Sequence, residues 1–535
     1  MSSTSLSAPA STSTPRRRRA RLWGMPPALL AAGVLVAIVV LAPVIITIEQ
    51  ALQGGTSAAL KSIDASSPRT LLLHSVLVAA VAAPLAGVIG VTSAWLVERT
   101  NVPLRWLWTL LAVAPLTMPL YVTSYAWASI GTITQGFLGA AGIIACSYCP
   151  IVFLLVAGAL RGMDPALEES ARSLGLNARR TFFRVILPQL RPALLGGMLL
   201  VVLDTLVEFD AFVALKYQTF TVHIYAQYEL SFSASGAAAL SLFSIVLCVL
   251  LLFGESWLRG GANYTRVSNG VRRPPTRYRL GWATLPALVW FVVEAGIAVG
   301  IPVGTLVYWL TQSSKAGVEG ASANLRYLWP ATLTTVALGV AAALLAIAYA
   351  LPVSLLAVRH RGRVATLIER STYLSFALPD LVAAIALAYV ASRYVPGLYE
   401  SVVLLVAAES VLFVPFAVVA LRATLGQLEP ALEDSARSLG LGPVRAFARV
   451  TMPLARPGMA AAGVLVFAFV LGDLGTAQIL LPPNMYTLGT EFEANASTVA
   501  FAAAAPFAAV LVGLSMLAAW LLMGRFGRVR AGGRS

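Results

Sequence analysis

Apolar residues run through this chain in blocks of about twenty, separated by short polar stretches rich in arginine. Because about 20 apolar helical residues span the hydrocarbon core of a bilayer, each block is typical of a membrane-spanning helix. The blocks predict twelve spans, at residues 26–48, 70–97, 106–130, 137–160, 193–213, 237–257, 282–311, 330–357, 371–392, 400–421, 458–480 and 504–523. We therefore expect an all-α polytopic membrane protein surrounded by lipid.

The distribution of charge supports this topology. The chain is 58% hydrophobic and 11% charged, which excludes an ordinary soluble domain. Its net charge of +15 comes from arginines clustered between the apolar blocks, so it indicates a cytoplasmic face and not a nucleic-acid partner. With both termini cytoplasmic, six of the 38 Lys and Arg residues fall outside, namely Lys61, Arg69, Lys216, Lys315, Arg326 and Arg393.

An internal repeat divides the chain into two parallel homologous halves. Residues 164–192 and 429–457, the first and second repeated segments, are offset by 265 positions and identical at 18 of 29 positions. Each follows the fourth span of its half and precedes the fifth, which indicates repeats related by an axis along the membrane normal. The expected organisation is a disordered basic cytoplasmic N-terminus (1–25), a first half (26–258, loop 161–192), a cytoplasmic linker (259–281), a second half (282–523, loop 423–457) and a cytoplasmic tail (524–535).

The repeated segments read as two short helices joined by a bend. Gly175 and Gly440 stand where the first helix needs a left-handed residue, and Pro188 and Pro453 are expected to end the second helix. An amphipathic helix on the lipid surface is the alternative, but it does not explain why both copies stayed alike. Two like surfaces in one chain indicate two copies of one partner.

The repeated segments resemble the EAA loop of ABC-importer permeases. The pattern falls on Glu168-Glu169-Ser170-Ala171 with Gly175, and on Glu433-Asp434-Ser435-Ala436 with Gly440, with Ser in place of the first Ala. The resemblance implies a type I importer permease of the bacterial inner membrane, two copies of an ABC ATPase subunit and an extracytoplasmic solute-binding protein. The candidate ATPase-docking residues are Glu168, Ser170, Ala171, Arg172, Gly175, Glu433, Ser435, Ala436, Arg437 and Gly440, in which each Glu precedes an Arg by four positions.

Within that family the chain is most similar to fused ferric-iron permeases. The resemblance lies in the stretch 116–126, which holds Tyr121 and Tyr125, and in Asp204 to Phe209. The chain departs from the family pattern at Glu208-Phe209-Asp210 and at 472–476. The resemblance implies import of ferric iron, with thiamine, phosphonate or polyamine import as alternatives. An ion-coupled secondary transporter is the remaining class, and it does not predict a repeated cytoplasmic loop.

Carboxylates at membrane depth are costly and usually face the interior of a helix bundle. The candidate pathway residues are Glu208 and Asp473 first, then Asp204, Asp210 and Asp380, with Tyr121 and Tyr125 from the resemblance. Such oxygen ligands suit a hard cation. A position near the outer interface, or hydrogen bonds between helices, would explain the same carboxylates equally well.

No ATPase motif is present in this sequence. A phosphate-binding loop needs Gly-Lys followed by Ser or Thr, and none of the three lysines follows a glycine. The three histidines are scattered and form no catalytic arrangement. We therefore expect no catalytic residue, no cofactor and no resident metal, and expect the energy to come from a separate subunit.

Overall fold

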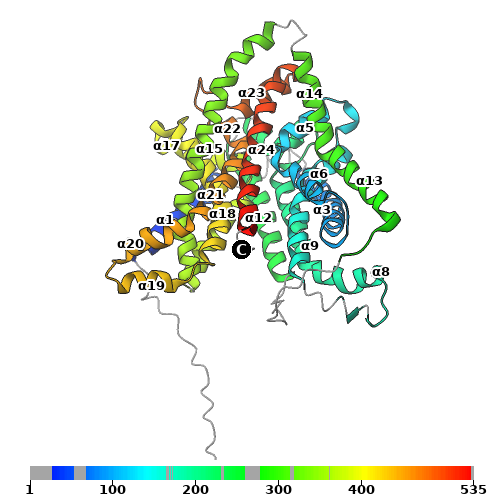
Figure 1. Cartoon of the computed structure of the whole chain (residues 1–535). Coiled ribbons are helices and arrows are strands. Elements are labelled where there is room, and N and C mark those ends of the chain that lie inside the picture. The colour runs from blue at the N-terminus through cyan, green and yellow to red at the C-terminus, as the bar shows by residue number, and fades with distance from the viewer. Residues whose placement is uncertain are drawn as a thin grey trace, which may run out of the picture.

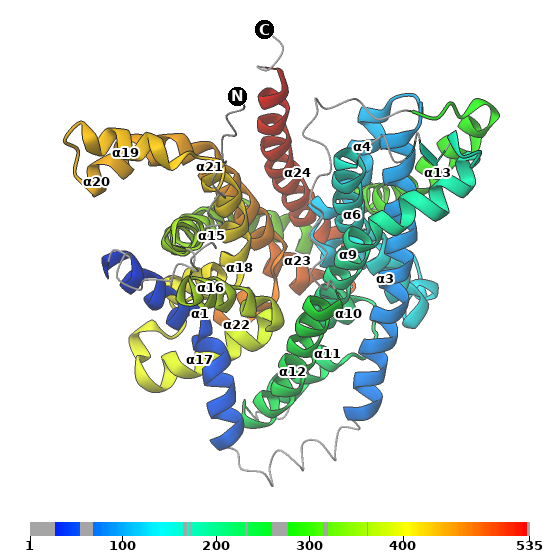
Figure 2. The same cartoon turned by 90° about the horizontal axis from the view of Figure 1, so that it is seen from below.

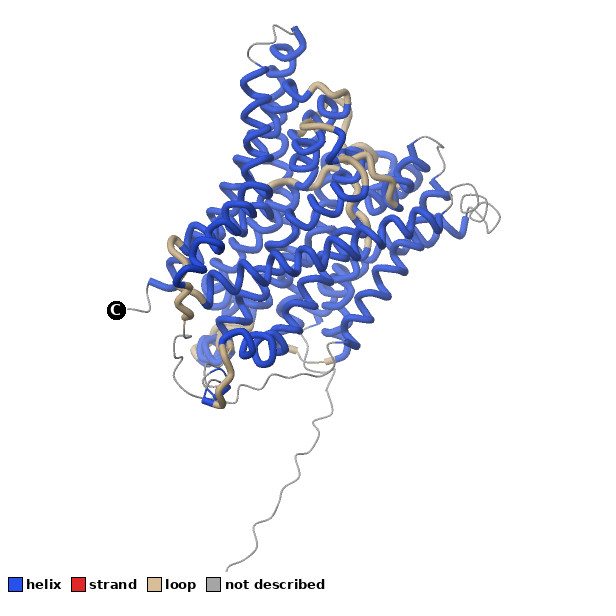
Figure 3. The backbone as a smooth tube through the Cα atoms, turned by 90° about the vertical axis from the view of Figure 1, so that its right-hand side faces the viewer, coloured by secondary structure: helices blue, strands red, loops and turns tan. Residues whose placement is uncertain are grey.

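The chain folds almost entirely into helices. The computed structural model describes residues 27–53, 68–163, 168, 170–171, 173–229, 234–258, 277–313, 319–360 and 362–531. Within these ranges the only extended pairing is an isolated bridge between Thr100 and Tyr278 (Figure 3). The all-α architecture predicted from the apolar blocks is confirmed.

The long helices of the two halves follow one another in a corresponding order, although the short elements between them differ (Figure 1). In the first half the elements are α1 (Pro27–Gln53), α3 (Pro68–Arg99), α4 (Arg105–Val113), η2 (Ala114–Thr117), α5 (Leu120–Ala128), η3 (Thr132–Thr134), α6 (Phe137–Gly162), α8 (Ala178–Thr181), η4 (Phe182–Ile186), α9 (Leu187–Val207), α10 (Asp210–Ala214), α11 (Phe220–Glu229) and α12 (Ala234–Leu258). In the second half they are η5 (Gly281–Ala283), α13 (Thr284–Ala295), η6 (Gly296–Gly300), α14 (Ile301–Ser313), α15 (Glu319–Arg359), α16 (Arg363–Tyr373), η7 (Leu374–Ala377), α17 (Asp380–Tyr394), η8 (Pro396–Leu398), α18 (Val402–Leu425), α19 (Pro430–Ser438), α20 (Pro443–Ala446), η9 (Phe447–Thr451), α21 (Met452–Gly472), α22 (Gly475–Leu480), α23 (Leu488–Ser497) and α24 (Phe501–Ala531).

The third span of each half is broken at a proline, although the sequence predicted single helices at 106–130 and 371–392. In the first half, α4 and η2 meet α5 at an angle of 90° around Pro119. In the second half, η7 and Pro379 separate α16 from α17 in the same way. The residue before each proline, Met118 or Leu378, is extended, because the proline ring disfavours helical geometry there.

This break changes the count of spans. In the described ranges, nine helices are long and apolar enough to cross a bilayer, and ten if α4 to α5 is taken as one bent span. Of the other expected blocks, 237–257 coincides with α12. The apolar part of α12 that the structure describes, Ser235–Leu250, is shorter than the length needed to span a bilayer. The block 371–392 is the broken α16–α17 pair.

The first span of each half packs against the other half. Helix α1 contacts α15, α16 and α17, where a side-chain carbon at Gly33 would lie 2.4 Å from Leu356 (Figure 2). Helices α13 and α14 contact α3, α4 and α5 in return. There the rings of Trp108 and Phe291 stack with centroids 5.1 Å apart. The halves defined along the chain are therefore not two separately packed bodies.

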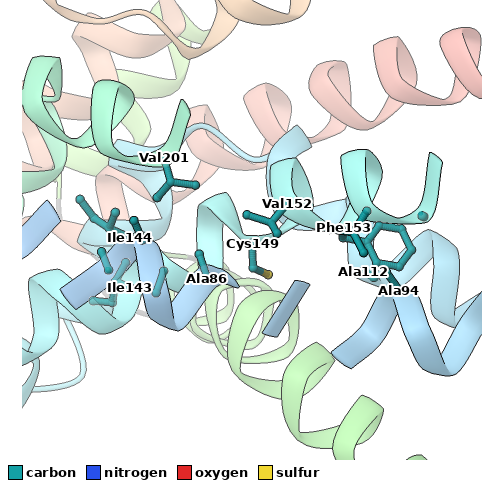
Figure 4. Close-up of a cluster of buried hydrophobic side chains, with 14 of the residues drawn as sticks. Ala86, Ala94, Ala112, Ile143, Ile144, Cys149, Val152, Phe153 and Val201 are labelled. Carbon is teal, nitrogen blue, oxygen red and sulfur yellow. The ribbon is translucent and has the colours of Figure 1, made fainter. Parts of the chain in front are cut away.

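Small residues bring the central helices of the first half into close contact. Ala86 and Ala94 of α3 face Cys149, Val152 and Phe153 of α6 in a buried cluster (Figure 4). A side-chain carbon at Gly90 would lie 2.8 Å from the backbone nitrogen of Phe153 and 2.9 Å from the carbonyl oxygen of Cys149. Because lipid tails are as apolar as the side chains, such backbone proximity is a main source of helix association in membranes.

Replacing Gly90 with alanine should therefore separate α3 from α6. We expect a loss of about 1–3 kcal/mol of unfolding free energy, the usual cost of overpacking, measured by denaturant titration of the purified protein in detergent. Gly142→Ala is the matched control, because a side-chain carbon there meets nothing within 4 Å. Equal stability of the two variants would contradict the close approach.

Candidate functional site

The two repeated segments lie at the same end of the molecule, on opposite sides of it (Figure 1). The first contributes α8, and the second contributes α19 and α20. Asp164 to Leu167, Glu169 and Arg172 lie outside the described residues, so the first segment is described only in part.

The bend in each segment has the geometry that the sequence predicted. Gly175 has a φ of +81° and Gly440 a φ of +89°, in the region that favours glycine. The N–H of the leucine after each glycine donates to the carbonyl of Ala171 at 3.1 Å or of Ala436 at 3.2 Å. These bonds close the end of the first helix as in a Schellman motif.

The second helix of each segment does not end at Pro188 or Pro453, as the sequence suggested. It passes through a π-helical turn, η4 or η9, and continues as the long helix α9 or α21. Each proline falls in the first turn of that long helix. The wider turn bonds each N–H five residues back, which lets the helix continue past a residue that has no N–H. Each segment is thus continuous with the fifth span of its half.

An arginine at the end of the second span holds each segment. Arg99, the last residue of α3, places Nη1 2.8 Å from Oε2 of Glu168, with side chains 0% and 2% exposed. Arg359, the last residue of α15, places Nη2 3.2 Å from Oε2 of Glu433. Glu168 and Glu433 therefore point into the protein, while Ser170 and Ser435 are exposed.

The predicted pairing between Glu433 and Arg437 is present. Nη2 of Arg437 lies 2.9 Å from Oε1 of Glu433. The glutamate is thus shared between two arginines, one in the membrane domain and one in the segment itself. Arg172, the counterpart of Arg437, lies outside the described residues.

Each segment presents an apolar side chain outward. Leu174 is 82% exposed and Leu439 is 85% exposed, and Val444 follows at 79%. Ala171 and Ala436 are buried against the body of the protein. Leucines and valines exposed together at the tips of two related loops are typical of a surface that another protein covers.

The fifth spans end at their acidic residues. The sequence placed Glu208 and Asp473 inside the spans 193–213 and 458–480, but α9 ends at Val207 and α21 at Gly472. Glu208 and Asp473 are extended, with ψ values of 135° and 122°, and short helices follow them. Asp204 lies one turn before Glu208, whose N–H donates to the Asp204 carbonyl at 3.0 Å. Each carboxylate therefore stands at a break in a membrane helix, where transporters often bind ions.

Glu208 is held by three neighbours, two at its carboxylate and one at its backbone carbonyl. The hydroxyl of Tyr148, in α6, donates to Oε2 of Glu208 at 3.1 Å. The backbone N–H of Ala211 donates to Oε1 at 3.0 Å. The Thr221 hydroxyl donates to the Glu208 carbonyl at 2.5 Å, which ties the break to α11. Glu208 is thus a fixed group and not a mobile side chain.

The second-half carboxylates face one another across the end of α22. Asp380 is the first residue of α17, and a side-chain carbon at Gly475 would lie 3.0 Å from its Oδ2. Asp473 and Asp210 lie within electrostatic range of Asp380, and Glu409 lies beside Asp473. The cluster therefore contains carboxylates from both halves, although the proximity of Asp380 could not be read from the sequence.

Glu409 was not among the residues that the sequence singled out. It lies in α18 within the expected span 400–421 and is only 4% exposed. A carboxylate well inside an apolar block was the available signal, but local pairing near the end of a span explained it as well. The structure places Glu409 next to Asp473 instead.

The two tyrosines of α5 join the halves. Tyr121 is 1% exposed and its hydroxyl donates to the Leu471 carbonyl at 3.5 Å. The rings of Tyr121 and Tyr125 lie 5.7 and 5.5 Å from that of Phe492. Tyr121 is also within electrostatic range of Asp210 and Asp473. Tyr121 thus lines the acidic cluster, and Tyr125 packs beside it.

Asp210 Oδ1 is a buried oxygen with no hydrogen-bond partner among the described residues. The side chains of Asp380, Glu409 and Thr476 lie close to the Asp473 carboxylate and interact with it. Among the described residues, no Lys or Arg forms an ion pair with the clustered carboxylates. Buried acceptors without a donor are costly, so the cluster suits a cation or water. In the same described ranges, no three His, Cys, Asp or Glu side chains converge to hold a metal ion in this conformation.

Comparison with known proteins matches both halves to one family. Residues 86–259 and 350–528 match the binding-protein-dependent transport system inner membrane component family. An Fe(3+)-transport system permease protein of Haemophilus influenzae is 34% identical over 435 residues, covering 81% of this chain and 85% of that protein. A ferric transport system permease protein of Actinobacillus pleuropneumoniae is 26% identical over 63% of this chain and 50% of its own length. A sulfate transport system permease protein of Salmonella typhimurium is 28% identical over 36% of this chain and 78% of its own length.

The two matched regions contain the two repeated segments and the two broken fifth spans, one of each per half. The family match, the parallel repeat and the apolar helices agree on a multi-pass transport component of the inner membrane. The chain belongs to the family of binding-protein-dependent transport system inner membrane components, the permease subunits of ABC importers.

Proposed function

We propose that this permease carries ferric iron, released by an extracytoplasmic binding protein, into the cytoplasm. The observation that carries the proposal is the cluster of Asp210, Asp380, Glu409 and Asp473 at the junction of the halves, which brings four carboxylates near one another with no described basic residue paired to them. Carboxylate oxygens are the ligands that hard cations prefer. Two relatives carry ferric or Fe(3+) transport in their names, which agrees with this chemistry.

The acidic cluster also argues against anionic substrates. Sulfate, named for another relative, and a phosphonate would be repelled by carboxylates that no described basic residue neutralises. Thiamine and polyamines are cations too, but they are long organic molecules that need apolar or extended contacts. A row of carboxylates along the junction, without a closed metal-binding group among the described residues, favours passage of a compact cation over its tight retention.

The repeated segments serve as docking sites for two copies of a separate ATPase subunit. Leu174 and Leu439 are the outward apolar contacts, and Ser170 and Ser435 lie on the exposed side. Glu168 and Glu433 act from within, because their bonds to Arg99 and Arg359 fix each segment to the second span of its half. ATP hydrolysis then takes place outside this chain, and both termini lie with the segments on the cytoplasmic side.

Movement of a docked ATPase would reach the acidic cluster through one continuous rod in each half. The segment turns at its glycine, passes through the π-helical turn and becomes α9 or α21, which ends at Glu208 or Asp473. A shift at the cytoplasmic end therefore moves the carboxylate at the other end of the same helix.

Valine at both Gly175 and Gly440 should uncouple ATP hydrolysis from uptake. A β-branched residue in the left-handed region costs about 1–2 kcal/mol at each site, so the segment would open or reorient. We expect lower iron uptake per ATP hydrolysed in proteoliposomes that contain the permease, its ATPase and its binding protein. Gly442→Val is the control, because Gly442 is extended with a φ of −63° and open space around it. Wild-type coupling in the double variant would argue against the docking role.

Removing charge from the pathway should slow transport without disturbing assembly. For Glu208→Gln with Asp473→Asn we expect uptake of radioactive Fe³⁺ to fall roughly tenfold, since one bond to a charged group is worth about 1.5–3 kcal/mol. Co-purification of the ATPase should be unchanged. Glu49→Gln, at an exposed carboxylate of α1, is the matched control. If the double variant kept wild-type uptake kinetics, these two residues would not line the pathway.

A further inference from the structure

The last residues of the linker between the two halves lie beside the first repeated segment. The N–H of Tyr278 donates to the Arg99 carbonyl at 2.8 Å, and the N–H of Asn101 donates to the Tyr278 carbonyl at 3.2 Å. The Asn101 side chain accepts from the N–H of Leu280 at 2.9 Å. This short parallel pairing fixes residues 277–280 against the end of α3. The chain then continues through η5 into α13.

From this position the Tyr278 side chain reaches the buried ion pair. Its hydroxyl donates to Oε1 of Glu168, while Arg99 occupies Oε2. Its ring lies 5.5 Å from that of Trp95, which in turn contacts Phe182 at 4.7 Å, edge to face. Phe182 opens the π-helical turn of the first repeated segment. Tyr278 thus contacts the first helix of that segment directly and its π-helical turn through Trp95.

The second half completes the same arrangement with its own residues. Glu433 accepts from Arg359 and from the Thr451 hydroxyl, the latter at 3.0 Å. Thr451 is the last residue of η9, and its counterpart 265 positions earlier is Ile186, the last residue of η4. Isoleucine has no hydroxyl to donate. At the place that Thr451 fills in the second half, the hydroxyl donor to the first-half glutamate comes from the linker, from Tyr278.

We infer that Tyr278 is a positioning residue for the first repeated segment: through its bond to Glu168, the linker between the halves fixes this segment to the membrane domain, a task that Thr451 performs inside the second segment. The inference rests on the proposed docking function, because it concerns how one docking site is held. It makes the two ATPase contacts unequal. Motion of the first segment is passed directly to α13 and thus to the second half, whereas the second segment is anchored within its own half.

The experiment compares the mobility of the two segments. Leu174 and Leu439, equivalent and both more than four-fifths exposed, are replaced by cysteine one at a time and spin-labelled. Cys146, Cys149 and Cys248 are replaced by alanine, so that each protein carries one label. The full chain is studied in lipid nanodiscs without any ATPase, by electron paramagnetic resonance.

Tyr278→Phe removes one hydroxyl and keeps the ring against Trp95. We expect the ratio of mobile to immobile label at position 174 to rise about tenfold, the effect of losing one bond to a charged group, with no change at position 439. Thr451→Val should produce the reverse pattern. Adding Ile186→Thr to Tyr278→Phe places the donor inside the first segment and should restore the immobile spectrum.

Two outcomes would overturn the inference: an unchanged spectrum at position 174 in Tyr278→Phe, or an equal change at both positions. Unfolding is recognised independently, by loss of the helical circular dichroism of the same nanodisc sample. The docking function is tested apart, by co-purification of the ATPase with the unlabelled chain, in which Leu174 and Leu439 are intact. If no ATPase co-purified, the proposed docking would fail, whatever Tyr278→Phe had shown.

Discussion

The interaction on which the arrangement depends is the buried ion pair between the end of the second span and the repeated segment. Arg99 and Arg359 occupy the same structural position, 260 residues apart, and each bonds a glutamate of its repeated segment, in a buried pair in the first half and a partly exposed pair in the second. Removing one partner of the buried pair leaves an uncompensated charge, at a cost of about 3–5 kcal/mol. The pair thus holds a short loop helix, which could not be stable alone, in a defined position beneath the bundle. Glu168 and Glu433 belong to the repeated pattern that resembles a partner-binding motif. In this fold they attach the repeated segments to the ends of the second spans.

The helices are interrupted where the two halves meet. In lipid an unpaired backbone group is very costly, so a membrane helix can break only where protein or water covers the break. Pro119 and Pro379 break the third spans, and Glu208 and Asp473 follow the ends of the fifth. All four breaks bring irregular backbone and polar side chains toward one region. The acidic cluster and the backbone groups at the four breaks therefore lie together in one polar interior, which apolar helices enclose.

Much of this could be predicted from the sequence. Block length gave the all-α fold, self-comparison gave the repeat, and the two glycines gave the left-handed bends, because each depends on local chemistry. Prolines within the apolar blocks, Pro119 and Pro379 among them, indicated interrupted helices, but the sequence did not distinguish a full break from a kink that packing accommodates. The residues of a π-helical turn, such as Phe182 to Ile186, show no sequence pattern that distinguishes the turn from an ordinary α-helix. Glu409 and Tyr278 were missed because their partners, Asp473 and Glu168, are distant in sequence and become neighbours only after the bundle has formed.

The exchange of first spans between the halves imposes an order on biosynthesis. Helix α1 is the first of the described helices along the chain. Apart from residues of α1 itself, the cluster that covers Val36 and Val40 consists of residues between Ala342 and Val470, which are synthesised more than 300 positions later. Until those residues are synthesised, the face of α1 that carries Val36 and Val40 is exposed to lipid, as in any fold dominated by contacts distant in sequence. Because the halves are joined in one polypeptide, the second-half residues that cover this face are made soon after α1 and close to it. Gene fusion would then serve the folding of this permease as much as the stoichiometry of its halves.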